Sequence, residues 1–191
     1  MKEGLLEFFN RYASVSPQDI EEIMGLVEVR TYNKNVRLTE IGEVEQHIFY
    51  IINGLARLFF YKGKNEVIVQ FIKEGALAVS AASFFSGTPS KYILETLEPT
   101  TALVITKQNL ENLYMKSKKW ERIGRLLTTN YFIIQEKQLL DNIRLSTKER
   151  LNKFITENPD LVQRVSQKSL ASLLNVKPET FSRLKPNPKN K

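Results

Sequence analysis

The chain has 191 residues, of which 42% are hydrophobic and 26% charged, a composition typical of a globular protein with one or two domains. It contains no cysteine, which excludes disulfide bonds, thiol nucleophiles, thiolate zinc sites and iron–sulfur clusters. Its net charge of +7 lies in one segment: residues 1–143 carry 17 Lys and Arg against 17 Asp and Glu, whereas residues 144–191 carry 11 against 4. A basic segment attracts polyanions; the alternative is a basic tail without a specific role.

Neither a membrane span nor a secretion signal is expected. No apolar run approaches the roughly 18 residues that a spanning helix needs. The first residues, MKEGLLEFFNRYASVSPQD, lack the apolar segment of a signal peptide. We therefore expect a cytoplasmic protein without membrane contact.

The N-terminal two thirds of the chain predict two short helices followed by a β-rich domain. Residues 5–26 contain the helical pieces LLEFFNRY and SPQDIEEIMGLV, where Ser16 can cap and Pro17 suits the first helical position. Seven short apolar strands with turn signals between them then follow: VEVRTY, NVRLTE, HIFYIIN, LARLFFY, EVIVQFI, YILETLE and TALVIT. Their even spacing favours an α+β fold with an N-terminal double-stranded β-helix, or jelly roll, over a sheet of βαβ units.

From Thr106 onward the pattern becomes helical. TKQNLENLYMKS predicts one helix, and KKWERIGRLLTTNYFIIQEKQLLDNIRL predicts a longer one with two adjacent apolar stripes. One stripe can pack on the β domain while the other meets a partner helix, and burial of both within one chain is the alternative. The second stripe consists of Leu126, Ile133 and Leu140. The residues predicted for the dimer helix are those of the first stripe: Trp120, Ile123, Leu127, Asn130 and Ile134, with Asn130 able to set the register.

The last quarter of the chain predicts a helix–turn–helix. Ser146 and Glu149 form a capping box for the helix TKERLNKFITEN, which Pro159 follows. Two short helices then begin at Gln167 and Pro178. Ala171 falls where they approach most closely, and Asn175 falls at the turn, where a positive φ is required. The side chains expected to be buried between the helices are Leu170, Leu174, Val176, Phe181 and Leu184.

The second short helix, PETFSRLK, turns polar side chains outward that can contact base edges or phosphates: Glu179, Thr180, Ser182, Arg183 and Lys185. An ordinary corner of two helices that closes a domain has the same spacing. The basic charge of this segment, and its position after a long helix, favour DNA.

A β-roll, a long helix and a C-terminal helix–turn–helix, in this order and at this length, resemble the catabolite-activator/FNR family of bacterial transcription regulators. The likeness covers nearly the whole chain, and PETFSRLK is similar to the family's recognition helix. It implies a β-roll domain at 1–118, a dimerisation helix at 119–143 and a DNA-binding domain at 144–191. It further implies a homodimer on double-stranded DNA, with RNA polymerase as another partner.

The resemblance also implies roles for single residues. Arg183 would donate to a guanine and Glu179 would accept from a cytosine amine. Phosphate contacts are expected from Gln167, Lys168 and Lys177. Two departures stand out: Lys177 replaces the usual hydroxyl cap, and KPNPKNK stands where the family has a two-stranded wing, so we expect no wing.

The effector region departs further from the family. The stretch GALAVSAASFFSGTPSKY, Gly75 to Tyr92, aligns with the family's cyclic nucleotide cassette. The glycine–glutamate pair for the ribose becomes Val79–Ser80, and the arginine for the phosphate becomes Ser90. Lys91 lacks the guanidinium fork, and a buried phosphate needs a paired cation. We therefore expect that cyclic AMP does not bind in the usual manner. This region either holds an apolar ligand or is simply packed together. The residues that would line an effector pocket, if one exists, are Gly75, Val79, Ser80, Ala81, Ser90, Lys91 and Tyr92.

Catalytic and metal-dependent functions find no support in the sequence. His47 is the only histidine, too few for a cupin metal site and an unpromising haem ligand at the start of a strand. No catalytic triad, phosphate loop or spaced pair of carboxylates is present, so we predict that the chain is not an enzyme and has no cofactor. The prediction is a transcription regulator; the alternative is a β-roll ligand-binding or protein-interaction module that no longer reads DNA.

Overall fold

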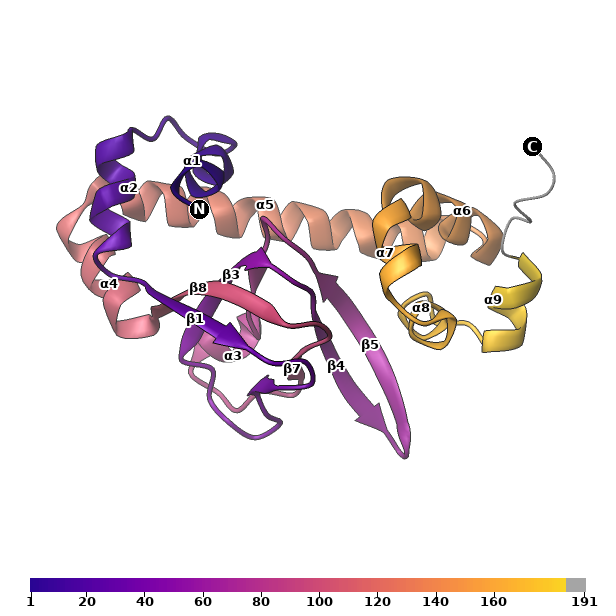
Figure 1. Cartoon of the computed structure of the whole chain (residues 1–191). Helices are drawn as coiled ribbons and strands as arrows, with labels where there is room; N and C mark the ends of the chain where they lie inside the picture. The colour runs from indigo at the N-terminus through magenta and orange to yellow at the C-terminus, as the bar shows by residue number, and fades with distance from the viewer. Residues whose placement is uncertain (185–191) are drawn as a thin grey trace. The chain divides into compact units, whose positions relative to one another are not determined.

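A computed structural model describes residues 1–184 (Figure 1). The chain divides into two compact units, which we describe separately. The first contains residues 1–60 and 69–129; the second contains residues 61–68 and the chain from residue 130 onward. The helix α5 (Lys118–Arg144) supplies residues to both.

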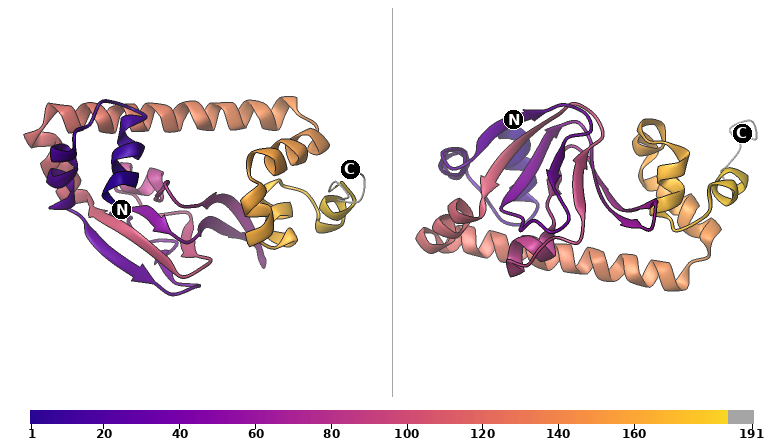
Figure 2. Two further views of the ribbon diagram at one scale, coloured as in Figure 1. Left: turned by 45° about the horizontal axis from the view of Figure 1, so that its top comes forward. Right: turned by 90° about the horizontal axis from the view of Figure 1, so that it is seen from below.

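The strands form the two sheets of a jelly roll (Figure 2). One sheet has the order β1-β8-β3-β6 and the other β2-β7-β4-β5. Their bounds are β1 Glu28–Tyr32, β2 Arg37–Thr39, β3 His47–Asn53, β4 Ala56–Lys62, β5 Asn65–Ile72, β6 Leu77–Ala78, β7 Ile93–Thr96 and β8 Thr100–Thr106. The predicted jelly-roll class is confirmed, and each of the seven predicted strands has its counterpart.

Alternation along β3 and β8 gives the first sheet two apolar faces. Phe49 on β3 lies opposite Val104 on β8, and both side chains enter the interior between the sheets. Tyr50 lies opposite Leu103, and both point to the other face. Because side chains alternate along a strand, the sheet is buried on both sides.

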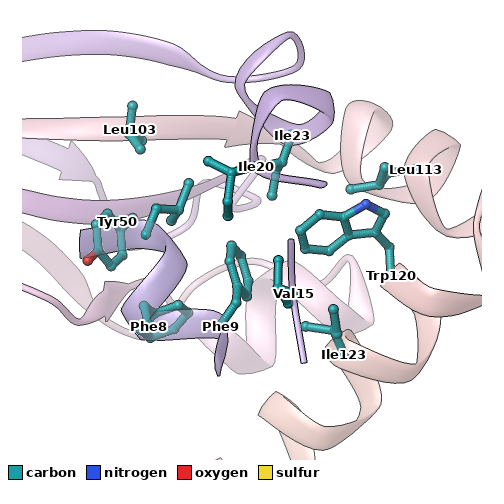
Figure 3. Close-up of a cluster of buried hydrophobic side chains, with 11 residues drawn as sticks. Phe8, Phe9, Val15, Ile20, Ile23, Tyr50, Leu103, Leu113, Trp120 and Ile123 are labelled. Carbon is teal, nitrogen blue, oxygen red and sulfur yellow. The ribbon is translucent and has the colours of Figure 1, made fainter. Parts of the chain in front are cut away.

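Helices cover the second face of this sheet (Figure 3). They are α1 (Lys2–Asn10), α2 (Pro17–Met24), α4 (Lys107–Lys116) and the beginning of α5. Phe9 of α1 packs against Trp120 of α5 edge to face, with ring centroids 5.1 Å apart. Ser16 and Asp19 form the capping box that starts α2. The helical layer is therefore fixed on the sheet by an aromatic core.

Two short elements have only weak local signals in the sequence, although α3 lies within the stretch Gly75–Tyr92 that aligns with the family's cyclic nucleotide cassette. The strand β6 has two residues, too few to show alternation, and α3 (Ala81–Ser86) begins without a side-chain cap. Gly87, at φ 71°, ends α3 and was its one local signal.

The second unit carries a group of short helices: α6 (Thr147–Glu157), α7 (Pro159–Arg164), α8 (Gln167–Leu173) and α9 (Pro178–Leu184). The helix pairs α6–α7, α8–α9 and α6–α9 are in contact. Each of the four helices buries a large side chain: Leu151, Leu161, Leu170 and Phe181. Within this unit the Ser172 hydroxyl also accepts a hydrogen bond from the Ile68 N–H at 3.0 Å and donates to the Glu66 carbonyl at 2.9 Å.

Candidate functional site

The helices α8 and α9 form the predicted pair around a tight turn. Asn175 has φ 54°, so the left-handed residue falls where the sequence predicts it. The Val176 N–H donates to the Ala171 carbonyl at 2.9 Å, and the Asn175 N–H donates to the Ser172 carbonyl at 3.0 Å. These two bonds are the Schellman arrangement that ends a helix. Ala171 and Phe181 are fully buried, so the small side chain lies in the core of this helix pair as expected.

Replacing Asn175 with alanine is expected to destabilise α8 and α9. An alanine methyl clashes in the left-handed region at a cost of about 1 kcal/mol, whereas glycine fits there without strain. Amide hydrogen exchange of α8 and α9 in the full chain would measure this. Asn152→Ala, in the exposed middle of α6, is the matched control. Equal loss of protection in the Asn175→Ala and Asn175→Gly variants would contradict the role assigned to this turn.

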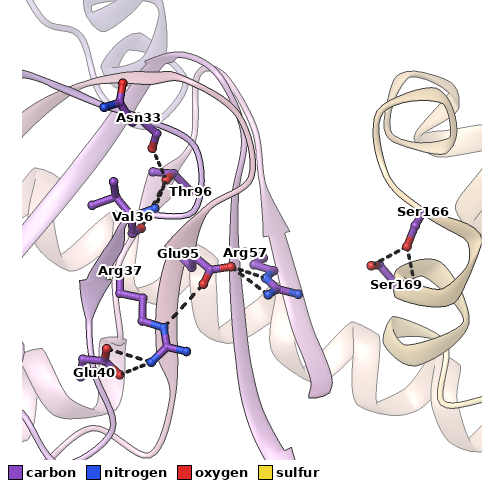
Figure 4. A network of polar contacts seen from close by, with 9 residues as sticks. All are labelled: Asn33, Val36, Arg37, Glu40, Arg57, Glu95, Thr96, Ser166 and Ser169. Carbon is purple, nitrogen blue, oxygen red and sulfur yellow. Dashed lines mark hydrogen bonds and ion pairs between the residues drawn. The ribbon is translucent and has the colours of Figure 1, made fainter. Parts of the chain in front are cut away.

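Most of the predicted DNA-contacting side chains are exposed. Thr180 is half-buried, and Lys185 lies outside the described residues. The exposed set comprises Gln167, Lys168, Lys177, Glu179, Ser182 and Arg183. At the start of α8 the Ser166 hydroxyl accepts from the Ser169 N–H at 3.1 Å, and the two hydroxyls lie 2.9 Å apart (Figure 4). This cap fixes the first turn of α8, which carries Gln167 and Lys168.

Arg150, which the sequence analysis did not single out, connects the helices of the second unit. Its guanidinium lies on α6 and donates to the carbonyls of Asn142 at 3.3 Å and Leu145 at 3.2 Å, at the end of α5. It also donates to the Leu174 carbonyl at the end of α8, at 3.5 Å. Nearby, Lys153 pairs with Asp141, and this hydrogen bond raises the pKa of the Lys153 amine. The end of α5 is thus bonded to α6, and through Arg150 to α8.

In the predicted effector region the serines are bonded to protein groups. Ser80 and Ser90 are buried, and their hydroxyl oxygens lie 2.8 Å apart. The Ser90 hydroxyl also accepts from the Tyr92 N–H at 3.1 Å. Lys91 is exposed. Ser90, the residue in the place of the family's phosphate-binding arginine, therefore closes a local turn.

The other predicted pocket residues lie around this turn. Gly75 has φ 75°, and its N–H donates to the Ile51 carbonyl at 2.9 Å. Val79 packs against the buried Phe84. Gly75, Val79, Ala81 and Tyr92 are all half-buried.

A buried carboxylate near this region was not predicted. Glu45 is 2% exposed; its carboxylate accepts from the Thr39 hydroxyl and, at 3.0 Å, from the His47 N–H. The Glu45 N–H donates to the Ser83 hydroxyl on α3 at 2.9 Å. Through these hydrogen bonds Glu45 joins β2, β3 and α3.

The arginines of the second sheet are also committed to carboxylates (Figure 4). Glu95 on β7 is buried, 2.8 Å from the Arg57 guanidinium on β4 and 3.6 Å from that of Arg37 on β2. Arg37 bonds Glu40 as well, at 3.0 Å. The three residues are cross-strand neighbours, so the pairs stabilise the register of β2, β7 and β4. Of these pairs, Arg57–Glu95 is largely buried on both sides, and breaking such a pair is costly, so Arg57 has a structural role.

The structure corrects part of the predicted dimer helix. Trp120 and Ile123 are 2% and 1% exposed, packed against α1 and α2 within their own unit, so neither has surface for a partner. Leu127 packs at the edge of the same core, Asn130 is half-buried and Ile134 is exposed. Further exposed apolar residues lie along α5 beyond this core. Five of them lie along one side of the helix, and we call them the α5 apolar row: Phe132, Ile133, Leu139, Leu140 and Ile143.

Within residues 1–184, no helix is both long and apolar enough to cross a membrane. No group of three or more potential metal ligands occurs in the same range. His47 is half-buried on β3, its ring centroid 5.9 Å from that of Phe49.

Comparison with known proteins agrees with the fold. Residues 29–117 match the family model of the cyclic nucleotide-binding domain. No curated protein sequence matches the chain.

Solved structures match over most of the chain. The c-di-GMP responsive global regulator CLP of Xanthomonas campestris is 17% identical, with a TM-score of 0.68 over 88% of this chain and 89% of that chain. FixK2 of Bradyrhizobium japonicum is 17% identical, with a TM-score of 0.72 over 83% and 82%. The catabolite activator protein of Thermus thermophilus is 18% identical, with a TM-score of 0.59 over 91% and 83%. The predicted resemblance is therefore confirmed in the fold: a β-roll of the cyclic nucleotide-binding type, a long helix and C-terminal helices.

Proposed function

We propose that this chain, which shares the fold of these regulators, is a sequence-specific DNA-binding transcription regulator that acts as a homodimer. The observation that carries the proposal is the α8–α9 pair. It combines a closely packed Ala171, a left-handed Asn175 and an exposed Glu179 and Arg183 on the second helix. These features fit a helix pair whose second member enters the major groove.

The chemistry of α9 suits base recognition. An arginine can donate two hydrogen bonds to guanine O6 and N7, and a glutamate can accept from the cytosine amine. Arg183 and Glu179 are four residues apart and so lie on one face of the helix. Lys168 and Lys177 supply positive charge for phosphates, which positions the helix without reading sequence.

The α5 apolar row supports the homodimer. Phe132 and Leu139 are seven residues apart, as are Ile133 and Leu140, and all four are exposed in the single chain. Apolar rows that repeat every seven residues pack against a second helix. Two copies joined in this way would present two recognition helices to half-sites roughly 34 Å apart, one turn of DNA.

The proposed role of the β-roll rests on the hydrogen bonds of Ser80 and Ser90. Ser90 stands where the family's phosphate-binding arginine would lie, and its hydroxyl is bonded to Ser80 and to the Tyr92 N–H. A buried phosphate would need a paired cation in that place. We propose that the roll does not bind cyclic AMP in the usual manner, and that any effector acts by shifting the population of DNA-binding arrangements.

The first test is selection from a random duplex library with the ligand-free full chain. Enrichment of a two-fold symmetric motif is expected. If nothing is enriched, the salt dependence of bulk DNA binding distinguishes a DNA-binding domain that lacks its effector from one that no longer binds DNA. An intact basic surface releases counterions and binds less tightly as the salt concentration rises. Absence of both enrichment and salt-dependent binding would overturn the proposal in favour of a β-roll module that does not read DNA.

Arg183→Ala is expected to weaken binding to the selected site by roughly 1–3 kcal/mol and to relax the preference at one base position. The reason is the loss of a bidentate contact to a single base. Fluorescence anisotropy on the selected site and on single-base variants of it would measure both effects.

Lys168→Ala is the matched comparison. Because a phosphate contact carries no sequence information, this variant should weaken binding to all sequences alike and lower the salt slope by about one. An unchanged base preference in Arg183→Ala would remove Arg183 from the recognition set.

A further inference from the structure

A cavity of about 80 Å³ lies in the first unit, between the β-roll and its helical cover. Its floor is the outer face of the first sheet, with Ile48 and Tyr50 on β3 and Leu103 on β8. Its roof consists of residues from α1, α2, α4 and α5, among them Trp120 (Figure 3). Phe49 and Val104, from the same strands, point to the opposite face of the sheet. The cavity is therefore distinct from the interior of the roll.

The wall of this cavity is chemically uniform. Aliphatic and aromatic side chains make up nearly all of it. Tyr50 and Trp120 each carry a polar group that is hydrogen-bonded to a partner outside the cavity wall. The Tyr50 hydroxyl donates to the Gly4 carbonyl at 3.1 Å, and the Trp120 indole N–H donates to the Glu22 carboxylate at 2.9 Å. A guest that needed strong hydrogen bonds or carried a charge would lose its hydration without compensation.

Tyr114, which also lines the cavity, packs against α5 at Gly124. A Cβ atom placed on Gly124 would lie 2.2 Å from the Tyr114 hydroxyl oxygen, so the tyrosine occupies space that only glycine leaves free. Glycine inside a helix is unfavourable relative to alanine, and here it has a packing reason. Burial raises the pKa of Tyr114, which keeps its hydroxyl neutral. The wall thus carries no charge at any pH near neutrality.

Protein interiors seldom keep voids larger than a water molecule, because the atoms around a void lose their dispersion contacts. Apolar cavities also stay dry, and one of about 150 Å³ binds benzene or xenon. Since a water molecule occupies about 30 Å³ of the liquid, this cavity has room for a guest of about three heavy atoms.

We propose that this cavity is a binding site for a small, uncharged, apolar molecule, of the size of a light hydrocarbon or a dissolved apolar gas. The guest would restore the missing contacts between the sheet and the helices. The proposal does not rest on DNA binding, and its readout does not involve DNA.

Trp120 provides that readout, because it is the only tryptophan of the chain and it lines the cavity. Xenon, an apolar atom that quenches tryptophan fluorescence on contact, is titrated into the full-length protein under pressure. We expect quenching that saturates. Cyclopropane should relieve it by competition, whereas propionate, of similar size but charged, should not.

Leu77→Phe tests the location. Leu77 is half-buried at the cavity wall, so a larger ring there fills the space, and saturable quenching should fall at least about fivefold. Leu38→Phe makes the same change at a half-buried residue of the roll interior and should leave the quenching unchanged. Near-ultraviolet circular dichroism checks that both variants fold.

Quenching that rises linearly with xenon, or that cyclopropane does not relieve, would overturn the proposal on the wild-type protein alone. Equal saturable quenching in the wild type and in a folded Leu77→Phe variant would overturn it as well.

Discussion

Phe181→Ala is expected to destabilise the C-terminal helices by about 3–5 kcal/mol, the usual cost of removing a buried phenylalanine ring. The ring is fully buried on α9, and α9 contacts both α8 and α6. Because small domains are stable by only about 5–15 kcal/mol, most of the protection of these helices would be lost. Amide hydrogen exchange of the full chain would show this, and binding to the selected DNA would be lost with it.

Two controls separate this effect from general damage. Trp120 fluorescence should not change, because Trp120 belongs to the first unit. Phe85→Ala removes the same ring from an exposed position on α3 and should alter stability by less than about 0.5 kcal/mol. If α8 and α9 keep their full protection in Phe181→Ala, then Phe181 is not the centre of this core.

The double variant Ile133→Glu/Leu140→Glu is expected to turn the homodimer into monomers. In a dimer of this double variant, the two chains together would place four carboxylates in the interface. This is the interface that the α5 apolar row forms in the proposed homodimer. Taking about 1 kcal/mol for each partly buried side chain, the dimer should dissociate at least about 100-fold more readily. Glutamate favours helices, so α5 itself should persist. Sedimentation velocity measures the change.

Tyr131→Glu/Gln138→Glu is the matched control. It adds the same charge at the same spacing on α5, at exposed positions on the side of the helix away from the α5 apolar row. This variant should remain dimeric. Dissociation of both variants to the same extent would show that added charge alone, and not the α5 apolar row, governs association; a monomeric wild type would remove the dimer from the proposed function.

Much of the fold could be predicted because local signals agree with it. The strands show alternation and turn residues, and the capping boxes at Ser16 and Ser146 mark the starts of α2 and α6. Asn175 was predicted at the left-handed turn because few residues besides glycine tolerate that conformation. These are properties of short segments, which the sequence displays directly.

What could not be predicted depends on contacts between distant segments. The two apolar stripes of α5 have the same spacing, so the sequence could not tell that Trp120 and Ile123 face α1 and α2 rather than a partner. Glu45 stands among polar residues, and only the fold buries it beside Ser83, 38 residues away. Such placements follow from how elements pack, which no window of sequence contains.

The bonds of Arg150 have a mechanical consequence. One rigid guanidinium grips carbonyls at the ends of α5 and α8, and both helix ends carry partial negative charge that the cation offsets. Because Arg150 bridges the two helix ends, we expect a rotation of the last turn of α5 to move the end of α8 with it, and not to be absorbed in the short connection at Leu145 and Ser146. A lysine at position 150 would keep the positive charge but not the planar group that reaches several carbonyls. The substitution would therefore weaken the connection between the two helix ends although the charge is unchanged.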